Sequence, residues 1–338
     1  MRESMSLKIC VIRTRNETVT KHNFDVFAEV FKECGFEVRE TFSRKDALSR
    51  RSDYYLASDL TTAFKLILRR KRYFYWMQGI APEESSMAGK PKIQSLVWAF
   101  LEKLIVKKTE FLFAVSSEMI KHLEKKYHVD LKYKSSVFPC YNTVLHKDSF
   151  FFKNKYNSNV FVYAGGLTPW QCFDEIIDIY KSIEDRQNDV SLLLLARDKI
   201  KAEEIVKGKG IRRYSIDYVS PAELDERLAV AKFGFIIRKD HPVNNVATPT
   251  KISSYLSNGI IPIFTSAIKD FAALVRDKQY VLQYDDASFS DRLTKLLSAD
   301  IEPDSIYEEY KSIFEEYYND GKHLANIRRE IERVIGNK

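Results

Sequence analysis

Residues 236–264 of the chain, IIRKDHPVNNVATPTKISSYLSNGIIPIF, contain the pattern that decides its fold. An apolar run over residues 233–238 predicts a buried strand, and the polar loop after it leads to a predicted helix over 250–257. A second apolar run over 260–264 predicts the next strand. A strand, a helix and a strand in this order are typical of the βαβ unit of a parallel sheet.

The start of the predicted helix carries a positive charge in an unusual place. Pro249 and Thr250 open the helix, and Thr248 is its expected N-cap. Lys251 then lies in the first turn, where the helix dipole disfavours a cation unless an anion shares the site. Together with Arg238 at the end of the preceding strand, Lys251 and the free N–H groups of the helix predict a binding site for a diphosphate.

The same alternation of strand and helix extends over the rest of the chain, which predicts an α/β protein with two Rossmann-like sheets. We expect the two domains to face a central cleft and the charged C-terminal helix to cross back over their junction. The other expected strands cover residues 8–13, 36–39, 54–57, 73–76, 111–115, 160–164, 191–196 and 216–219.

The domain boundaries follow from a stretch in which this alternation stops. Residues 137–159 hold Pro139, several Asn residues and mixed charge, which is typical of an interdomain linker. We therefore predict an N-terminal domain over residues 1–145, a linker over 146–159, a nucleotide-binding domain over 160–320 and a C-terminal helix over 321–338.

A second binding loop is predicted after the strand over residues 160–164. Gly165 and Gly166 follow that strand and allow a ligand to approach the backbone closely, with a helix N-terminus just beyond them. Most Gly-Gly pairs after strands serve only a tight turn. The prediction of a binding loop rests instead on its position at the carboxyl end of the sheet, where α/β proteins bind ligands.

The composition bounds the class of protein. At 338 residues, 45% of them hydrophobic, the chain is long enough for two cores. Its four cysteines are scattered and form no zinc or disulfide pattern, which favours a reducing cytoplasm. No stretch reaches the roughly 18 apolar residues of a membrane span, and the apolar run in residues 1–13 is too short for a signal peptide.

The net charge of +7 is concentrated in the N-terminal half. Residues 1–150 carry 27 Lys and Arg against 18 Asp and Glu, and the run over 65–72, KLILRRKR, mixes apolar residues with four consecutive cations. The alternatives are a solvated basic surface, an anionic membrane, a lipid-phosphate substrate and nucleic acid. No recognition helix or aromatic platform accompanies the run, so we expect no nucleic acid partner.

The motifs of the second half resemble those of GT-B glycosyltransferases, in particular family 4-like bacterial enzymes of surface polysaccharide biosynthesis. The resemblance covers about residues 160–267, and the N-terminal half is similar only around YWMQGIAPEES and FAVSSEM. Tyr163, Gly165 and Gly166 match the first strand and loop of the donor domain. The donor-binding signature itself is matched, in order, by Arg238, Asn244, Asn245, Pro249, Thr250, Lys251, Tyr255, Leu256, Gly259 and Pro262.

The resemblance implies a nucleoside-diphosphate sugar as donor, with UDP as the expected nucleotide, and no required cofactor or metal. It assigns Arg238, Lys239 and Lys251 to the diphosphate. The other implied donor contacts are Gly165, Gly166, Asn244, Thr250 and Ser254. One departure concerns the paired glutamates of the family, because Val246 and Ser254 stand in their positions. The sugar and the stereochemistry of transfer therefore stay open.

The N-terminal half supplies a candidate acceptor side. Glu83 and Glu84 follow the aromatic strand over 73–76, and Glu83 is our candidate base for an acceptor hydroxyl. The plainer alternative is that both are first-turn carboxylates of a helix. Ser116 is expected to cap the helix after the strand over 111–115, and His241 is the one histidine in the donor loop.

We therefore expect a cytoplasmic, peripheral glycosyltransferase that moves a hexosyl or related group to a glycan or lipid-linked acceptor. Two alternatives stay open: a catalytically degenerate protein that binds nucleotide sugars, and a nucleotide-sugar epimerase. An epimerase needs carboxylates for proton transfer, and the two glutamate positions of the donor motif hold none.

Overall fold

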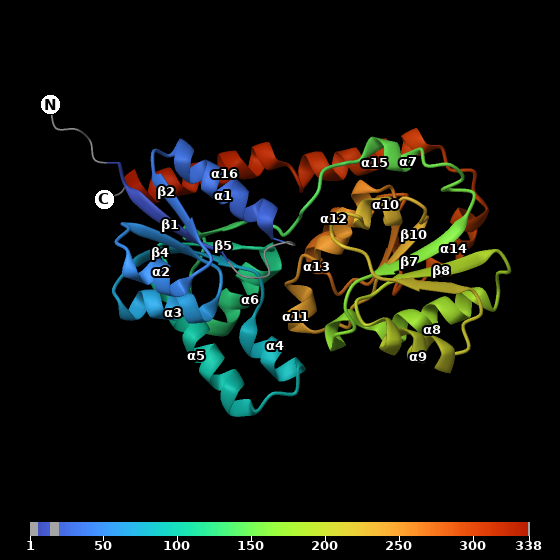
Figure 1. Cartoon of the computed structure of the whole chain (residues 1–338), viewed down its shortest axis with the longest axis horizontal. Coiled ribbons are helices and arrows are strands. Elements are labelled where there is room, and N and C mark those ends of the chain that lie inside the picture. The colour runs from blue at the N-terminus through green and yellow to red at the C-terminus, as the bar shows by residue number, and fades with distance from the viewer. Residues whose placement is uncertain (1–5, 14–19, 337–338) are drawn as a thin grey trace. The chain divides into compact units, whose positions relative to one another are not determined.

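The computed structural model describes residues 6–13 and 20–336, and the chain divides into two compact units (Figure 1). Residues 1–5, part of the N-terminal segment considered for a signal peptide, lie outside this description. Unit 1 comprises residues 1–142, 246–248 and 319–338, and unit 2 comprises 143–245 and 249–318. Each unit holds a six-stranded sheet whose paired strands all run parallel.

The sheet of unit 1 has the order β2-β1-β3-β4-β5-β6. Its inner strands are continuously apolar because helices cover both faces, which is what a buried parallel sheet requires. Aromatic rings fill the core beside it, and the ring of Phe27 packs against those of Trp76 and Phe113 at 5.8 and 5.0 Å. The strands are β1 (Lys8–Ile12), β2 (Glu37–Thr41), β3 (Tyr54–Ala57), β4 (Arg72–Met77), β5 (Phe111–Ala114) and β6 (Ser135–Val137).

The helices of unit 1 cover the two faces of its sheet. Helices α1 and α16 lie on one side of the sheet, and α2, α3 and α5 lie on the other (Figure 1). Ser116 caps α6 as expected, since its hydroxyl accepts a hydrogen bond from Met119 N at 3.0 Å. The helices are α1 (Lys21–Glu33), α2 (Arg44–Ser49), α3 (Leu60–Leu68), α4 (Ala81–Met87), α5 (Lys92–Lys108), α6 (Ser117–Tyr127) and α16 (Asp320–Gly336).

The last helix packs on unit 1. Helix α16 packs along α1, and its first residue, Asp320, bonds to His22 Nε2 at 2.8 Å and also accepts from the Tyr141 hydroxyl. Residues 319–338 therefore belong to the same compact unit as the N-terminal sheet.

The sheet of unit 2 has the order β12-β11-β10-β7-β8-β9, so β7 and β10 lie side by side at its centre. Its strands are β7 (Asn159–Ala164), β8 (Val190–Leu195), β9 (Tyr214–Asp217), β10 (Phe233–Ile236), β11 (Ile261–Phe264) and β12 (Leu282–Gln283). Its helices are α7 (Lys147–Phe150), the 3₁₀ turn η2 (Pro169–Gln171), α8 (Phe173–Glu184), α9 (Lys199–Gly208), α10 (Leu224–Leu228), α11 (Pro242–Asn245), α12 (Thr250–Ser257), α13 (Lys269–Leu274), α14 (Phe289–Ser298) and α15 (Pro303–Glu316).

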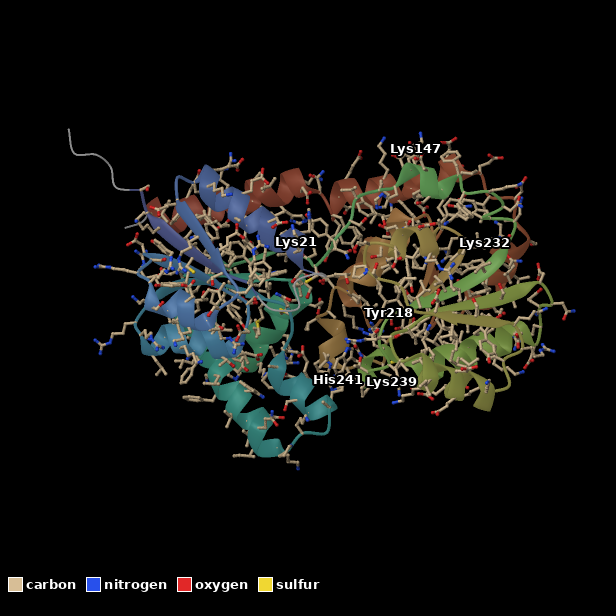
Figure 2. All side chains as sticks on the ribbon, in the orientation of Figure 1. Lys21, Lys147, Tyr218, Lys232, Lys239 and His241 are labelled. Atoms are coloured by element: carbon tan, nitrogen blue, oxygen red, sulfur yellow. The ribbon has the colours of Figure 1, made fainter. Side chains whose placement is uncertain are left out.

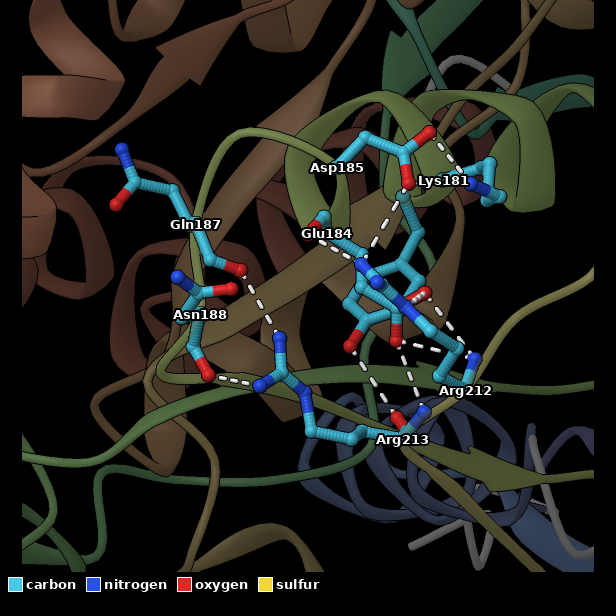
Figure 3. Close-up of polar contacts among 8 residues, drawn as sticks. Lys181, Glu184, Asp185, Gln187, Asn188, Arg212 and Arg213 are labelled. Carbon is cyan, nitrogen blue, oxygen red and sulfur yellow. Dashed lines mark hydrogen bonds and ion pairs between the residues drawn. The ribbon is translucent and has the colours of Figure 1, made fainter.

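A buried carboxylate fixes the end of α8 to the edge strand β9. Glu184 is fully buried, and its carboxylate accepts hydrogen bonds from the backbone N–H groups of Arg212 and Arg213 at 2.8–3.1 Å (Figure 3). The Arg213 side chain in turn donates to the Gln187 carbonyl at 2.9 Å. Because these bonds satisfy a buried charge within one unit, we assign the cluster a structural role.

Several expected elements differ in extent. Residues 221–230, whose pattern predicts one helix, form only the short helix α10, and the predicted strand over 216–219 starts earlier as β9. Residues 306–334, whose strongly charged sequence predicts a helical tail, form parts of two helices, because α15 ends at Glu316 and α16 begins at Asp320. Among the helices of residues 6–13 and 20–336, none has the length and apolar character needed to cross a membrane.

Candidate functional site

The candidate site lies in unit 2 at the point where the strand order reverses. From β7 the chain proceeds to β8 and β9 on one side, and β10 begins the series on the other side. In open parallel sheets, ligands bind beyond the carboxyl ends of the strands at such a switch point. Gly165 directly follows β7, and Arg238 comes two residues after β10, so both predicted binding loops meet there.

Gly165 is required by its backbone conformation and lies next to a lysine. Its φ of +150° is rarely adopted by L side chains, and a Cβ at this position would lie 2.6 Å from Lys251 Nζ. Its own N–H donates to the Leu195 carbonyl at 2.9 Å, which holds the loop against β8. Gly166 differs, because a Cβ there would meet nothing within 4 Å. Of the two glycines, Gly165 brings the backbone next to Lys251.

Two predicted cations converge on one neutral side chain. Lys251 Nζ donates to Gln171 Oε1 at 2.6 Å, and Arg238 Nη2 donates to the same oxygen at 2.9 Å. Lys251 Nζ also lies 4.2 Å from the centre of the Tyr163 ring, a favourable cation–π contact. Arg238 is 5% exposed, and its Nη1 donates to the Ile237 carbonyl at 2.8 Å.

The positive charge of this pair is not neutralised. Among the described residues, no carboxylate forms an ion pair with Arg238 or Lys251. Burial lowers the pKa of Lys251 well below its usual value, and the charge of Arg238 lowers it further. Burial also lowers the pKa of Arg238. Two nearly buried cations that share a single amide oxygen form a site suited to an anion.

Helix α12 carries Lys251 in its first turn, as predicted. The N-cap is Pro249 rather than Thr248, and no side chain caps the helix. Thr248 is engaged elsewhere, because its hydroxyl accepts from Cys140 N at 3.1 Å within unit 1. The helix start thus leaves the backbone N–H groups of Thr250 and Lys251 without a side-chain acceptor from the N-cap.

Thr250 and Ser254 are linked by the helix itself. The Thr250 carbonyl accepts hydrogen bonds from the hydroxyls of Ser253 at 2.9 Å and Ser254 at 3.2 Å. Ser254 is 6% exposed. Val246, at the other position where the family has a glutamate, is buried and belongs to unit 1, where its carbonyl accepts from Ser116 at 2.6 Å.

The loop after β10 carries the remaining predicted residues. Lys239 lies next to His241 (Figure 2), is 63% exposed and pairs with Glu175 of α8, which raises the pKa of Lys239. Asn244 is buried and donates from Nδ2 to the Lys239 carbonyl at 2.9 Å, so it holds the loop. His241 Nδ1 accepts from Val243 N at 3.2 Å. The structure therefore does not bring Lys239 into the Arg238–Lys251 pair.

In unit 1, Glu83 and Glu84 both lie in the first turn of α4. Glu83 bonds to His122 Nε2 at 3.1 Å and pairs with Lys126 Nζ at 2.7 Å. Burial opposes its ionisation, but these contacts outweigh it and lower the pKa of Glu83. Glu84 instead lines a cavity of about 450 Å³ together with Asp59, Gln78 and Trp98, and burial raises its pKa.

Three positioning residues were not assigned a role from the sequence. Gln171 follows Gly166 in the loop after β7, but only the fold shows that it bonds to both cations. The Tyr255 hydroxyl accepts from Ala164 N at 3.0 Å, which ties α12 to the end of β7. Thr265 accepts from Arg238 N at 2.9 Å and donates to its carbonyl at 2.7 Å. In the sequence, Gln171 and Thr265 were marked only by their place after strands, and Tyr255 only as a member of the donor-binding signature.

Comparison with known proteins shows which fold the chain has. No family model and no curated protein sequence matches the chain. Solved structures do match it over nearly its whole length. Sucrose-phosphate synthase from Thermosynechococcus elongatus aligns with a TM-score of 0.75 at 10% identity, covering 98% of this chain and 100% of that chain.

Two further structures give the same result. A glycosyltransferase from Rickettsia africae ESF-5 aligns with a TM-score of 0.63 at 11% identity and covers 99% and 100% of the two chains. An alpha-glucosyltransferase in complex with UDP and a 13-mer DNA aligns with a TM-score of 0.62 at 15% identity and covers 96% and 100%. The structural neighbours are thus glycosyltransferases of GT-B type, and the chain has the GT-B fold.

Proposed function

We propose that the protein is a glycosyltransferase that uses a nucleoside-diphosphate sugar as donor. The observation that carries the proposal is the pair of Arg238 and Lys251, which share the neutral oxygen of Gln171 at the switch point of a GT-B donor domain. A diphosphate supplies the negative charge that the described residues around this pair do not. We propose UDP as the nucleotide, in line with the UDP complex of the alpha-glucosyltransferase neighbour.

The chemistry that these residues perform is stabilisation of the leaving group. As the bond from the sugar to the diphosphate breaks, negative charge grows on the phosphate oxygens, and preorganised cations lower the energy of that state. Arg238 is held by the Ile237 carbonyl and by Thr265, so its position is fixed before the donor arrives. Gly165 lets the ligand and Lys251 share the space beside β7.

We further propose that Thr250, Gly165, Gly166 and the loop around Asn244 contact the donor, and that Ser254 takes the place of a family glutamate there. Lys239 is the weaker candidate for the diphosphate, because it is exposed and paired with Glu175. For the acceptor side we propose the acidic pair at the start of α4, in which Glu84 borders a cavity and Glu83 is held by Lys126.

The acceptor that we propose is a glycan or a lipid-linked sugar in the assembly of a bacterial surface polysaccharide, with transfer of a hexosyl or related group by a family 4-like enzyme. The excess of cations in residues 1–150 supports a cytoplasmic protein in peripheral contact with an anionic membrane.

The test compares single variants of the two cations. Arg238→Ala and Lys251→Ala are expected to lower kcat/KM and the affinity for the donor by at least about a hundredfold, the range found when a buried charge contact to a substrate is removed. Lys201→Ala, an exposed lysine on α9, is the matched control and should behave like the wild type. Near wild-type kinetics in both cation variants would overturn the assignment.

A catalytically inactive nucleotide-sugar-binding protein is the second candidate, favoured by Val246 and Ser254 at the glutamate positions. A panel of nucleoside diphosphates and nucleotide sugars, screened by thermal shift, tests binding, because a ligand of the native state raises Tm. Binding without transfer to any acceptor extract supports this candidate. Isomerised sugar formed without an acceptor points instead to an epimerase.

A further inference from the structure

Helix α5 of unit 1 exposes a stripe of large apolar side chains. Ile93, Leu96, Val97 and Phe100 are 68%, 65%, 50% and 66% exposed. Their spacing of three and four residues places them on one face of the helix. Isolated exposed apolar residues are ordinary, whereas four consecutive members of one helical face form a continuous patch that marks an interaction surface.

The exposed charged residues of α5 itself are all positively charged. Lys92, Lys103, Lys107 and Lys108 are the exposed charged residues of α5. The single carboxylate of the helix, Glu102, is fully buried on the opposite face, where it accepts hydrogen bonds from Lys126 and Tyr127. An exposed apolar face flanked by lysines combines burial of apolar side chains with attraction to anionic headgroups, which suits the interface of an anionic bilayer.

The neighbouring helices extend the positive surface. Helices α2, α3 and α5 lie on the same side of the sheet (Figure 1), and α3 packs against α5. A cavity of about 350 Å³ between α2 and α3 has no carboxylate in its lining, which consists of Arg44, Lys45, Leu48, Ser49, Lys65 and Arg69.

The basic residues of this cavity are mostly uncompensated. Only Arg44 forms an ion pair, with Asp59 at 3.1 Å; across the described residues, Lys45, Lys65 and Arg69 form none. A cavity of this size lined by four cations suits a phosphate group. Leu68, at the end of α3, is 65% exposed and adds a further apolar side chain to this side of the unit.

We propose that this side of unit 1 docks on an anionic phospholipid bilayer. The stripe of Ile93, Leu96, Val97 and Phe100 enters the boundary between headgroups and acyl chains, and the lysines of α5 and the basic cavity bind phosphate headgroups. Charge complementarity selects this occupant over a second copy of the chain, because a symmetric pairing would bring two lysine-flanked faces together. The inference rests on the peripheral contact in the proposed function and is independent of the donor site.

The test measures binding of the full chain to sedimented vesicles. Vesicles of phosphatidylcholine with about one third phosphatidylglycerol should bind the wild type, and pure phosphatidylcholine should bind it much less. In Leu96→Glu/Phe100→Glu, binding to the anionic vesicles should fall by about a hundredfold, or about tenfold for each apolar side chain. Ile200→Glu, which changes a side chain 75% exposed on α9 of unit 2, is the matched control and should bind like the wild type.

A second variant tests the headgroup contacts. Lys45→Gln/Lys65→Gln/Arg69→Gln should weaken binding to anionic vesicles by about a hundredfold and reduce its dependence on salt, since each cation near the surface contributes roughly a fivefold attraction. The same proteins should show unchanged Tm shifts with UDP, so a failed donor site and a failed membrane site give different results.

The outcomes that overturn the inference are distinct. The proposed membrane docking is contradicted if the wild type does not bind anionic vesicles, or binds neutral vesicles equally well. It is also contradicted if Leu96→Glu/Phe100→Glu binds anionic vesicles as well as the wild type does. If the wild type forms a dimer in sedimentation velocity that this variant abolishes, while no vesicle binding occurs, the stripe is an interface between two copies.

Discussion

The Oε1 atom of Gln171 accepts a hydrogen bond from Lys251 Nζ at 2.6 Å, and the same atom accepts one from Arg238 at 2.9 Å. In the free protein a neutral amide thus occupies the position that a phosphate oxygen suits better. Both hydrogen bonds are charge-assisted on the donor side only, so an anionic acceptor gains more from the same donors.

Replacing this amide by a carboxylate should change stability and nucleotide affinity in opposite directions. Gln171→Glu places a negative charge between the two cations, so the free energy of unfolding should rise by about 1–3 kcal/mol, the value of a hydrogen bond that gains charge. The same carboxylate competes with the diphosphate, so the affinity for the nucleoside diphosphate should fall at least about tenfold. Denaturant unfolding and calorimetric titration measure the two effects. Gln171→Leu is the control: it should lose stability and keep its affinity, and equal affinity in both variants would contradict the competition.

The two glycines after β7 give a matched pair. Gly165→Ala forces a Cβ to within 2.6 Å of Lys251 Nζ at a φ of +150°. We expect it to displace Lys251, to destabilise unit 2 by about 1–3 kcal/mol and to weaken donor binding by at least tenfold. In Gly166→Ala the added Cβ meets nothing within 4 Å, so its stability should stay within about 0.5 kcal/mol of the wild type. Thermal unfolding of both variants and UDP titration of Gly165→Ala check this, and equal losses of stability in both variants would show that the backbone conformation of Gly165 does not require a glycine.

Binding of the donor should be coupled to a proton. Burial, and then Arg238, hold the pKa of Lys251 well below its usual value in the free protein. A bound diphosphate raises that pKa again, so binding takes up a proton wherever free Lys251 has lost one, and the affinity falls as the pH rises above the lowered pKa. Calorimetry in two buffers of different ionisation enthalpy measures the uptake, at or above about pH 7.5, where the phosphate itself is fully ionised.

The control for this coupling is Lys251→Arg, which keeps the charge in a group that does not lose its proton in this range. It should bind the nucleotide without proton uptake. Uptake of the same size in the variant would assign the proton to another group.

Variants of Glu83 and Glu84 at the start of α4 distinguish a catalytic base from a residue that stabilises the fold. Glu84→Gln should lower kcat for transfer by about a hundredfold or more if this carboxyl, which borders the cavity, accepts the proton of the acceptor hydroxyl. Glu83→Gln should mainly lower stability, because it breaks the ion pair with Lys126 at 2.7 Å. Kinetics and unfolding of both variants decide between them. A large loss of kcat in Glu83→Gln alone would favour Glu83 as the base.

The sequence predicted the elements that bury continuous apolar faces. The strand Tyr54–Ala57 and the helix Thr250–Ser257 have the predicted bounds, because their periodicity changes sharply at each end. Strands β6 and β12 contain three and two residues, too few for any periodicity, and neither was predicted.

The candidate site was predictable from a cation that the helix dipole disfavours. Lys251 in a first helical turn indicated an anion before any contact was known. The role of Gln171 was not predictable, because β7 and β10 become neighbours only through the strand order, and only then does this side chain reach Arg238 and Lys251. The engagement of Glu83 by Lys126 and of Lys239 by Glu175 likewise depends on residues distant in the sequence.

A buried lysine outside the site should make stability depend on pH. Lys155 is 2% exposed and donates to the Ala229 carbonyl at 2.7 Å, and burial lowers its pKa to about 7. Between this value and its usual pKa of 10.5, the unfolded chain holds the proton and the folded protein has lost it. The unfolded state thus binds more protons, and the free energy of unfolding rises with pH, by about 2 kcal/mol from pH 7 to 9 for this group.

Lys155→Met keeps the length of the side chain and removes its titration. Urea unfolding at pH 7 and pH 9 measures how much the free energy of unfolding rises between the two pH values. In Lys155→Met this rise should be about 2 kcal/mol smaller than in the wild type. Lys153→Met, two residues away and exposed, should leave the wild-type pH dependence intact. Because Lys232 is also fully buried, with a pKa lowered to about 8, part of the wild-type rise should persist in Lys155→Met and disappear only when both lysines are replaced. An unchanged slope in the double variant would mean that both lysines keep their protons in the folded protein.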